Sequence, residues 1–199
     1  MLPSNRFETV NGPQEIVFTF SNRLKRLIFG GSPGHHNRTL HTLPHSIGEL
    51  DSLEELVLDK CKCLENLPDS IGNLGQLTFL SMKECKAITE IPESLGQCKK
   101  LVEISFLKCT KLRSLPDSVG DLVELEDLCL GKCLALTELP RTVGSLPKIS
   151  RLDLYKCIKL KELPESLSKI ATLRCLECRG CTGLVSIPEA LKDNPALHI

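Results

Sequence analysis

The sequence has no excess of charge of either sign, no long apolar run and no secretory leader pattern. Its 25 Lys and Arg residues balance 25 Asp and Glu residues, which disfavours binding to nucleic acid or to an anionic membrane through bulk charge. No stretch approaches the ~18 consecutive apolar residues of a membrane span, and the start, MLPSNRFETVNG, lacks a basic segment followed by an apolar one. We therefore expect a cytoplasmic protein whose eleven cysteines are reduced thiols rather than a disulfide scaffold.

The sequence also lacks the motifs of common nucleotide-binding and hydrolytic sites. It contains no GxxxxGKS or GxxxxGKT, no GxGxxG after a strand-like run, no HExxH and no GxSxG. We expect no enzymatic activity, no cofactor and no bound metal. An enzyme would need side chains gathered on the face of a sheet, and the pattern described next places no histidine there to act as a base.

What the sequence does have is one period of 24 residues. Seven prolines keep it, each preceded by Leu or Ile: Pro44, Pro68, Pro92, Pro116, Pro140, Pro164 and Pro188. Six cysteines keep it too, each seven residues before a proline: Cys61, Cys85, Cys109, Cys133, Cys157 and Cys181. The unit at 53–76, LEELVLDKCKCLENLPDSIGNLGQ, generalises to LxxLxLxxCxxLxxLPxSIGxLxx, which predicts a repeat array.

Each unit predicts one short strand and one short helical turn. Alternation places Leu56 and Leu58 inside, with Glu55, Val57 and Asp59 outside, as a half-buried strand requires. In LPxSIGxL the proline marks a turn, the serine is expected to be an N-cap, and Ile and Leu three apart suit a helical or 3₁₀ turn. One unit cannot bury its own leucines but stacked units can, so the leucines are structural and function lies between them.

This pattern resembles the leucine-rich repeat, from about Leu24 to the end of the chain. The resemblance implies an α/β solenoid, a curved right-handed superhelix with a parallel β-sheet on the concave face and short helical or 3₁₀ turns on the convex face. We expect an N-terminal cap or partial repeat over 1–23 and a leucine-rich repeat array over 24–199. The array would hold about seven repeats, the first with five extra residues in GGSPGHHNRT, and it stops where Leu197 starts an eighth. Such an end exposes apolar groups, so we expect a fragment of a longer protein, a truncated gene product or self-association through this end.

The cysteines and histidines could suggest metal or redox chemistry, but structural roles account for them better. In leucine-rich repeats the periodic slot holds Asn or Cys, whose side chain bonds to the backbone after the strand. The CxxCxxC string at 175–181 has a metal-like spacing, but the repeat places its three thiols on the sheet face, in the core and in the cysteine ladder. The remaining candidates are expected to lie in a solvated loop without metal or glycan: His35, His36, His41, His45 and the sequon Asn37-Arg38-Thr39.

The third, fifth and seventh places of each repeat are expected to project from the concave face. The candidate protein-binding residues there are Glu55, Val57, Phe79, Glu103, Leu107, Asp127, Arg151, Asp153, Tyr155 and Arg179. Phe79, Leu107 and Tyr155 are large side chains placed outward, as interface anchors are, although scattered exposed apolar residues are also ordinary.

The eighth place stacks lysines from three consecutive repeats into a candidate basic strip, Lys108, Lys132 and Lys156. The strip either keeps the edge of the sheet soluble or receives an acidic partner or a phosphate. Acidic residues such as Glu54 and Glu126 gather on the opposite rim, so the face is expected to be dipolar and to orient a charged protein or peptide.

Within the repeat family, LPDSIGNL at 67–74 and LPDSVGDL at 115–122, with the 24-residue period and Cys in the ladder, resemble the repeat domains of plant intracellular TIR or coiled-coil disease-resistance receptors. The resemblance implies non-catalytic recognition of a protein partner in defence signalling. The alternative is a constitutive cytoplasmic scaffold of the Ras-group or phosphatase-regulating type, although these usually carry Asn in the ladder and a 23-residue unit. An F-box adaptor would need a helix pair that 1–23 does not offer.

Overall fold

The computed structural model describes residues 24–29 and 40–192, in which seven strands and seven short helical segments alternate along the chain. The strands are β1 (Arg26–Ile28), β2 (Glu55–Val57), β3 (Phe79–Ser81), β4 (Glu103–Ser105), β5 (Asp127–Cys129), β6 (Arg151–Asp153) and β7 (Cys175–Glu177). The 3₁₀ turns are η1 (His45–Glu49), η2 (Asp69–Asn73), η3 (Glu93–Gln97), η4 (Asp117–Asp121), η5 (Arg141–Ser145) and η6 (Glu165–Lys169), and the α-helix α1 (Glu189–Lys192) follows β7.

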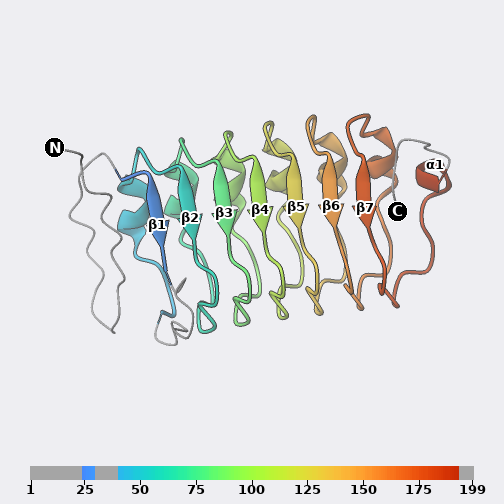
Figure 1. Ribbon diagram of the computed structural model, residues 1–199, viewed down its shortest axis with the longest axis horizontal. Helices are drawn as coiled ribbons and strands as arrows, with labels where there is room; N and C mark the ends of the chain where they lie inside the picture. Colours follow the sequence, from blue (N-terminus) through green and yellow to red (C-terminus); the bar gives the residue numbers. More distant parts are fainter. Residues whose placement is uncertain (1–23, 30–39, 193–199) are drawn as a thin grey trace.

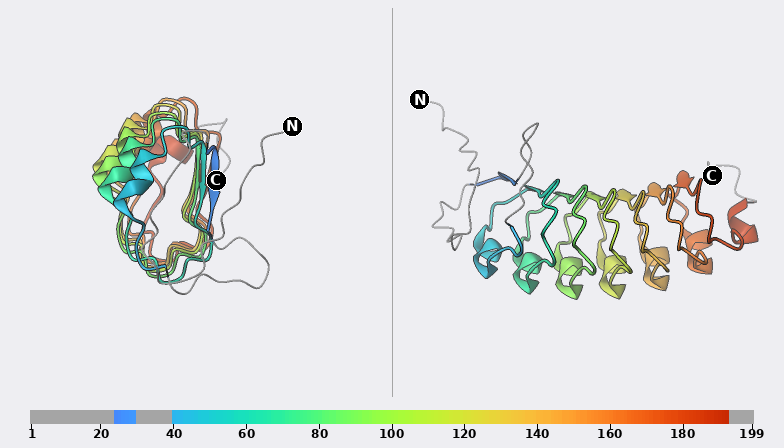
Figure 2. Two further views of the ribbon diagram at one scale, coloured as in Figure 1. Left: turned by 90° about the vertical axis from the view of Figure 1, so that its left-hand side faces the viewer. Right: turned by 90° about the horizontal axis from the view of Figure 1, so that it is seen from below.

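The strands form one parallel sheet in sequence order, β1 to β7, as Figure 1 shows. From β2 onward each residue pairs with the residue 24 positions later, so Leu56 lies beside Leu80 and Leu128 beside Leu152. Between β1 and β2 the offset is 29, since Leu27 pairs with Leu56, and the five-residue excess lies in the first repeat. The sheet lies along one side of the array and the 3₁₀ turns along the outer arc on the other (Figure 2), which confirms the predicted leucine-rich-repeat solenoid.

At each strand the fourth and sixth places of the repeat point into the core. Leu56 and Leu58 have no exposed surface, whereas the intervening Val57 is half-buried, which confirms the predicted alternation. After the sixth place the chain turns: the Cys61 N–H donates to the Leu58 carbonyl (3.1 Å), and Lys60, the second of the two residues between them, has a φ of 63°. The same left-handed conformation recurs at the eighth place of the following repeats, in the turn that follows each strand.

The prediction that the Ser of LPxSIGxL caps the helical turn is wrong. The capping position of η2 is Pro68, with φ −71° and ψ 152°, and no side chain caps the turn. Ser70 lies one residue inside the turn, where its buried hydroxyl has no hydrogen-bond partner among the described residues. Instead it packs against the previous repeat, because a β-carbon on Gly48 would lie 2.7 Å from the β-carbon of Ser70. The SIG sequence therefore serves the packing of neighbouring turns rather than capping.

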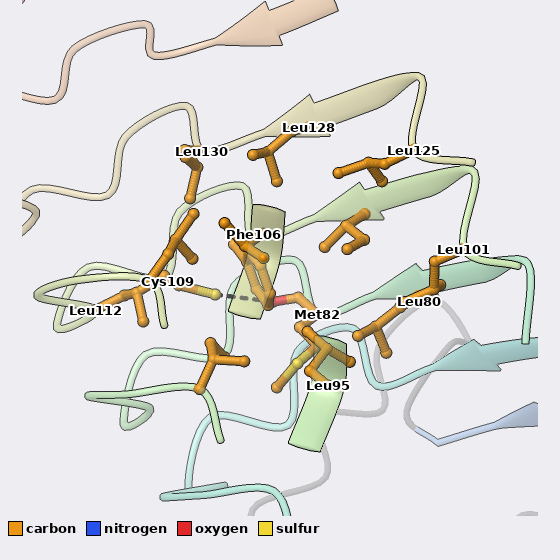
Figure 3. Close-up of a cluster of buried hydrophobic side chains, with 14 of the residues drawn as sticks. Leu80, Met82, Leu95, Leu101, Phe106, Cys109, Leu112, Leu125, Leu128 and Leu130 are labelled. Carbon is orange, nitrogen blue, oxygen red and sulfur yellow. Dashed lines mark hydrogen bonds between the residues drawn. The ribbon is translucent and has the colours of Figure 1, made fainter. Parts of the chain in front are cut away.

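The core runs the length of the solenoid between sheet and turns, and Figure 3 shows a part of it around Met82, Phe106 and Leu128. The periodic cysteines line one side of this core. Each thiol donates to a carbonyl oxygen of the preceding repeat, as Cys109 does to Met82 (3.0 Å) and Cys133 to Phe106 (3.2 Å). The expected cysteine ladder is thus confirmed, and all eleven cysteines are free thiols.

Several expectations fall on residues outside the described part of the chain. These are the cap or partial repeat at 1–23, the inserted loop at 30–39 with His35, His36 and the Asn37 sequon, and the start of an eighth repeat at Leu197. Within the described part, the array ends in α1, whose Leu191 is buried and which contacts η6. None of the described helical segments is long and apolar enough to cross a bilayer.

Candidate functional site

The outer face of the sheet carries the predicted binding residues in columns, because parallel in-register strands place equivalent positions side by side. Glu55, Phe79 and Glu103 are neighbours in the column that opens the strands, and Asp127 and Arg151 continue it. The next column contains Val57, and its Ser81 and Ser105 are buried although they point away from the leucines. Side chains on the outer face therefore cover one another rather than standing free.

In the N-terminal half of this face, charges are neutralised between neighbouring repeats. Arg26 Nε lies 2.8 Å from Glu55 Oε2, and Lys25 Nζ lies 2.6 Å from Glu54 Oε1. Three residues of the predicted acidic rim are thus paired with cations, because Arg151 also contacts Asp127, whereas Glu103 and Glu126 form no ion pair among the described residues. Phe79 is half-buried in this half, between the repeats of Glu55 and Glu103.

Asp153 organises the C-terminal half of the face. Its Oδ1 accepts the backbone N–H of Tyr155 (2.9 Å), and its Oδ2 accepts the Cys129 thiol (3.5 Å) and lies 3.8 Å from Arg151 Nη2. Arg151 also contacts Asp127 (3.4 Å). Burial raises the pKa of Asp127, and the Arg151 guanidinium opposes this rise. The predicted residues Asp127, Arg151 and Asp153 are thus one connected network.

Leu107, the second predicted anchor, is in contact with its neighbours in the next repeats. A β-carbon on Gly131, one repeat later, would lie 3.1 Å from Leu107 Cδ1 and 3.2 Å from Asp153 Oδ1. Leu107 therefore leans into the space that the missing side chain of Gly131 leaves, and it is half-buried there. The residues with the most exposed large apolar side chains are Val123, Leu134, Ile158 and Val185, all outside the strands.

Tyr155 is the one of the three predicted anchors whose ring lies beside two lysine side chains. Lys132 Nζ lies 5.6 Å and Lys156 Nζ 5.2 Å from the centre of its ring, which are cation–π distances. Next to it, Arg179 donates through Nε and Nη2 to the carboxylate of Glu177 (3.0 and 2.7 Å). Phe79 lies three strands away, so the three predicted anchors do not form one patch.

The predicted basic strip is not uniform. Lys108 Nζ lies 2.8 Å from Glu84 Oε1, and this hydrogen bond lowers the pKa of Glu84. Lys132 and Lys156 instead contact the Tyr155 ring, as described above. The strip therefore reduces to the two lysines at Tyr155. The sequence did not indicate this difference, because all three lysines occupy the same place in the repeat.

No group of three or more His, Cys, Asp or Glu side chains within residues 24–29 and 40–192 is arranged to hold a metal ion. The three thiols of the CxxCxxC string lie in different places. Cys181 donates to the Leu154 carbonyl (3.0 Å), Cys178 packs against the core, and Cys175 is the first residue of β7 on the sheet face. Burial raises the pKa of the ladder thiols Cys61 and Cys109 to about 12, which makes these two poor metal ligands and nucleophiles. At the end of the ladder, a hydrogen bond with Cys157 instead lowers the pKa of Cys181 to about 7. His41 lies 3.7 Å from Glu65 rather than in a cluster with His45, the first residue of η1.

Sequence reasoning missed a groove of about 1140 Å³ along the LP segments and the first residues of η3 to η6. Its lining includes six carboxylates and two cations: Glu90, Glu93, Asp117, Glu138, Glu162, Glu165, Arg141 and Lys169. The signal in the sequence is that a place flanking the LP pair is acidic in most repeats.

A family model, the Leucine Rich Repeat, matches residues 52–74, which is one repeat. No curated protein matches the chain. Among solved structures, the leucine-rich repeat domain of the type III effector XopL is similar, with 25% identity and a TM-score of 0.69 over 89% of this chain and 68% of that one.

Two further solved structures support the fold alone. One is the Arabidopsis receptor kinase HAESA in complex with the peptide hormone IDA and a co-receptor, at 23% identity and a TM-score of 0.52, covering 83% of this chain and 30% of that one. The other is Listeria monocytogenes InlP, at 20% identity and a TM-score of 0.55, covering 82% of this chain and 41% of that one. The chain spans less than half the length of either protein. The seven stacked strands, the cysteine ladder and these similarities together identify the fold as a leucine-rich-repeat solenoid.

Proposed function

We propose that this chain is a non-catalytic recognition module that binds a protein partner on the sheet face over β4 to β7. Leucine-rich-repeat domains are typically interaction modules, and HAESA is a repeat protein solved with a peptide hormone. Most leucines of the described chain are buried in the core, so specificity is left to the outer face of the sheet.

The observation that carries this proposal is the position of Tyr155. It is the single tyrosine of the chain, half-buried on the sheet face, and it is held at its backbone by Asp153 and contacted by two lysines. Tyrosine is enriched among residues that dominate interface energies, because it offers a large rigid apolar surface together with a polar tip. A partner side chain packed on it would also lie close to the charges of Lys132 and Lys156.

We extend the proposal to the class of receptor. The 24-residue unit, the cysteine in the ladder and LPDSIGNL at 67–74 support a sensing domain of the kind found in plant intracellular disease-resistance receptors. The reduced thiols of the ladder support a cytoplasmic location, since they suit a reducing compartment. Such a module would bind a pathogen protein or a host protein that the pathogen modifies.

The test is quantitative capture of partners from cells of the source organism with the wild-type chain and two variants. Tyr155→Ala should reduce the captured amount of the partner about 30-fold, as expected for an interface residue of this kind. Ile158→Ala is the control, because it removes an exposed apolar side chain three residues later, outside the strands. Equal capture by both variants would exclude this face.

The identity of the captured protein tests the receptor class. A pathogen-secreted protein, or a host protein altered by one, supports the sensing domain. A resident signalling enzyme such as a small GTPase or phosphatase contradicts it and supports the constitutive scaffold instead.

A further inference from the structure

The lysines at the eighth place of the repeats divide into two electrostatic classes. In the N-terminal half, Glu84 occupies the eighth place of its repeat and contacts Lys108 of the next repeat. The charge of Lys60 also lowers the pKa of the Glu84 carboxyl. In the C-terminal half, Lys132 and Lys156 follow each other with no acidic residue at this place. Over the described ranges of the chain, no carboxylate forms an ion pair with either of them.

The carboxylates nearest in the sheet are already engaged. Asp153 accepts the Tyr155 N–H and the Cys129 thiol and contacts Arg151, and its side chain is only 13% exposed. Glu177 accepts the backbone N–H of Arg179 as well as its guanidinium. Neither carboxylate can turn toward the two lysines without giving up these bonds, so their ammonium groups remain uncompensated within the chain.

The two lysines are also held in place from the backbone. Both lie in the left-handed region, with φ of 61° and 56°, in the turn that closes each strand. The Lys132 N–H donates to the Tyr155 carbonyl (2.6 Å) and the Lys156 N–H to the Arg179 carbonyl (2.9 Å). Consecutive repeats are spaced by about 4.8 Å in a sheet, so the two side chains start from neighbouring points on a rigid frame and meet at one aromatic ring.

We infer that Lys132, Tyr155 and Lys156 form a lysine–tyrosine clamp that binds an acidic segment, rich in Asp and Glu, of the protein partner. The inference rests on the proposed function and names the chemistry of the partner at that site. A carboxylate between the two ammonium groups gains attraction from both, while the neighbouring aliphatic atoms pack on the ring. Because the side chains of the clamp already lie against one another, binding loses less side-chain entropy.

A short acidic peptide fits this clamp better than a nucleic acid. In the predicted strip the unpaired cations are only Lys132 and Lys156, because Lys108 is paired with Glu84 and the neighbouring Arg179 with Glu177. A polyanion needs a longer track of unpaired cations, and the chain as a whole has no net charge. A segment with two or three carboxylates matches the extent of the clamp.

The clamp can be tested without knowing the partner, by fluorescence anisotropy of a labelled hexaglutamate peptide with the full chain. The variants are Lys132→Gln with Lys156→Gln, and Lys108→Gln alone as the matched control. Lys108 occupies the same place of the repeat with the same left-handed φ, but its charge is already compensated. We expect each clamp substitution to weaken binding about 5-fold and the pair about 20-fold, with less than 2-fold for the control, at low ionic strength.

Charge-preserving variants separate the role of the clamp from a folding defect. The Lys132→Arg and Lys156→Arg pair should retain most of the binding, and a hexalysine peptide should not bind. Equal loss in Lys108→Gln, unchanged affinity in the double glutamine variant, or tighter binding of a single-stranded oligonucleotide would each overturn the inference. If the captured natural partner depends on Tyr155 but not on the two lysines, the proposed function stands and the acidic-segment inference falls.

Discussion

A β-carbon on Gly120 would lie 2.6 Å from the β-carbon of Thr142 on the next turn, and 2.5 Å from its carbonyl oxygen. Such distances do not occur between real atoms, so the glycine of the SIG-type sequence is required by the close approach of η4 and η5. The same relation links Gly48 to Ser70 and Gly72 to Ser94. The spacing of the turns is thus set by a glycine in one repeat and a small hydroxyl residue in the next.

This contact predicts the effect of Gly120→Ala. Because the neighbouring atom is backbone, the turns must separate, and we expect the free energy of unfolding to fall by about 2–3 kcal/mol in urea titrations. Gly75→Ala is the control, since a β-carbon there meets nothing within 4 Å, and its effect should stay within about 0.5 kcal/mol. Equal loss in the two variants would show that close packing of the turns is not the cause.

The left-handed φ of Lys60 predicts that glycine substitutions at Lys60 and Lys62 change the free energy of unfolding in opposite directions. Lys60 has a φ of 63°, a region that costs an ordinary residue energy and glycine almost none, so Lys60→Gly should raise the free energy of unfolding by about 0.5–1 kcal/mol. At Lys62 no such φ occurs, and Lys62→Gly should lower it by about 0.5–1 kcal/mol through the greater freedom of the unfolded chain. Destabilisation by both changes would contradict the strain assigned to the eighth place.

The cysteine ladder predicts a specific loss of stability on truncation. Cys133 is fully buried and donates to the Phe106 carbonyl, so Cys133→Ala removes a hydrogen bond and leaves a small void. We expect a loss of about 1–2 kcal/mol by urea unfolding. Cys63 is half-buried and outside the ladder, and Cys63→Ala should change stability by less than about 0.5 kcal/mol. A neutral Cys133→Ala would mean that the ladder bonds contribute nothing.

The thiol pKa values predict that the fold weakens in alkali. Burial raises the pKa of Cys61 and Cys109 from 9.0 to about 12, and it raises that of Cys133 as well. Since the folded pKa is above the unfolded one, the stabilisation is complete below pH 9.0 and is lost progressively as pH rises toward about 12. Thiolate absorbance and circular dichroism recorded together should show most thiols ionising only as the chain unfolds. Ionisation of Cys61 or Cys109 near pH 9 in a folded chain would contradict this burial.

The sequence was sufficient to predict the repeat architecture, because every core position recurs with the same spacing. Leu56, Leu80 and their equivalents need only an apolar side chain at a fixed place, and the register follows from the period. The ladder was predictable for the same reason. The capping role predicted for Ser70 is wrong because the pattern within one turn does not show that the residue packs against Gly48 of the previous turn.

The candidate site was less predictable, because its contacts depend on residues one repeat away. The surroundings of Leu107, for example, depend on the space that Gly131 leaves one repeat later. Lys108 and Lys132 look alike in sequence, and only the neighbours Glu84 and Tyr155 distinguish them. The alternation could place a residue on the outer face but could not determine which neighbour covers it or pairs with it.

Residue-specific photo-crosslinking tests the central claim, that the sheet face over β4 to β7 receives the partner. A photoreactive phenylalanine analogue is placed at Tyr155 on that face, at Leu134 in an exposed turn, or at Asp117 in the acidic groove, and the chain is irradiated with the captured partner. We predict a covalent adduct from position 155, none from 134 and none from 117. An adduct from 117 with none from 155 would contradict the account and assign recognition to the groove.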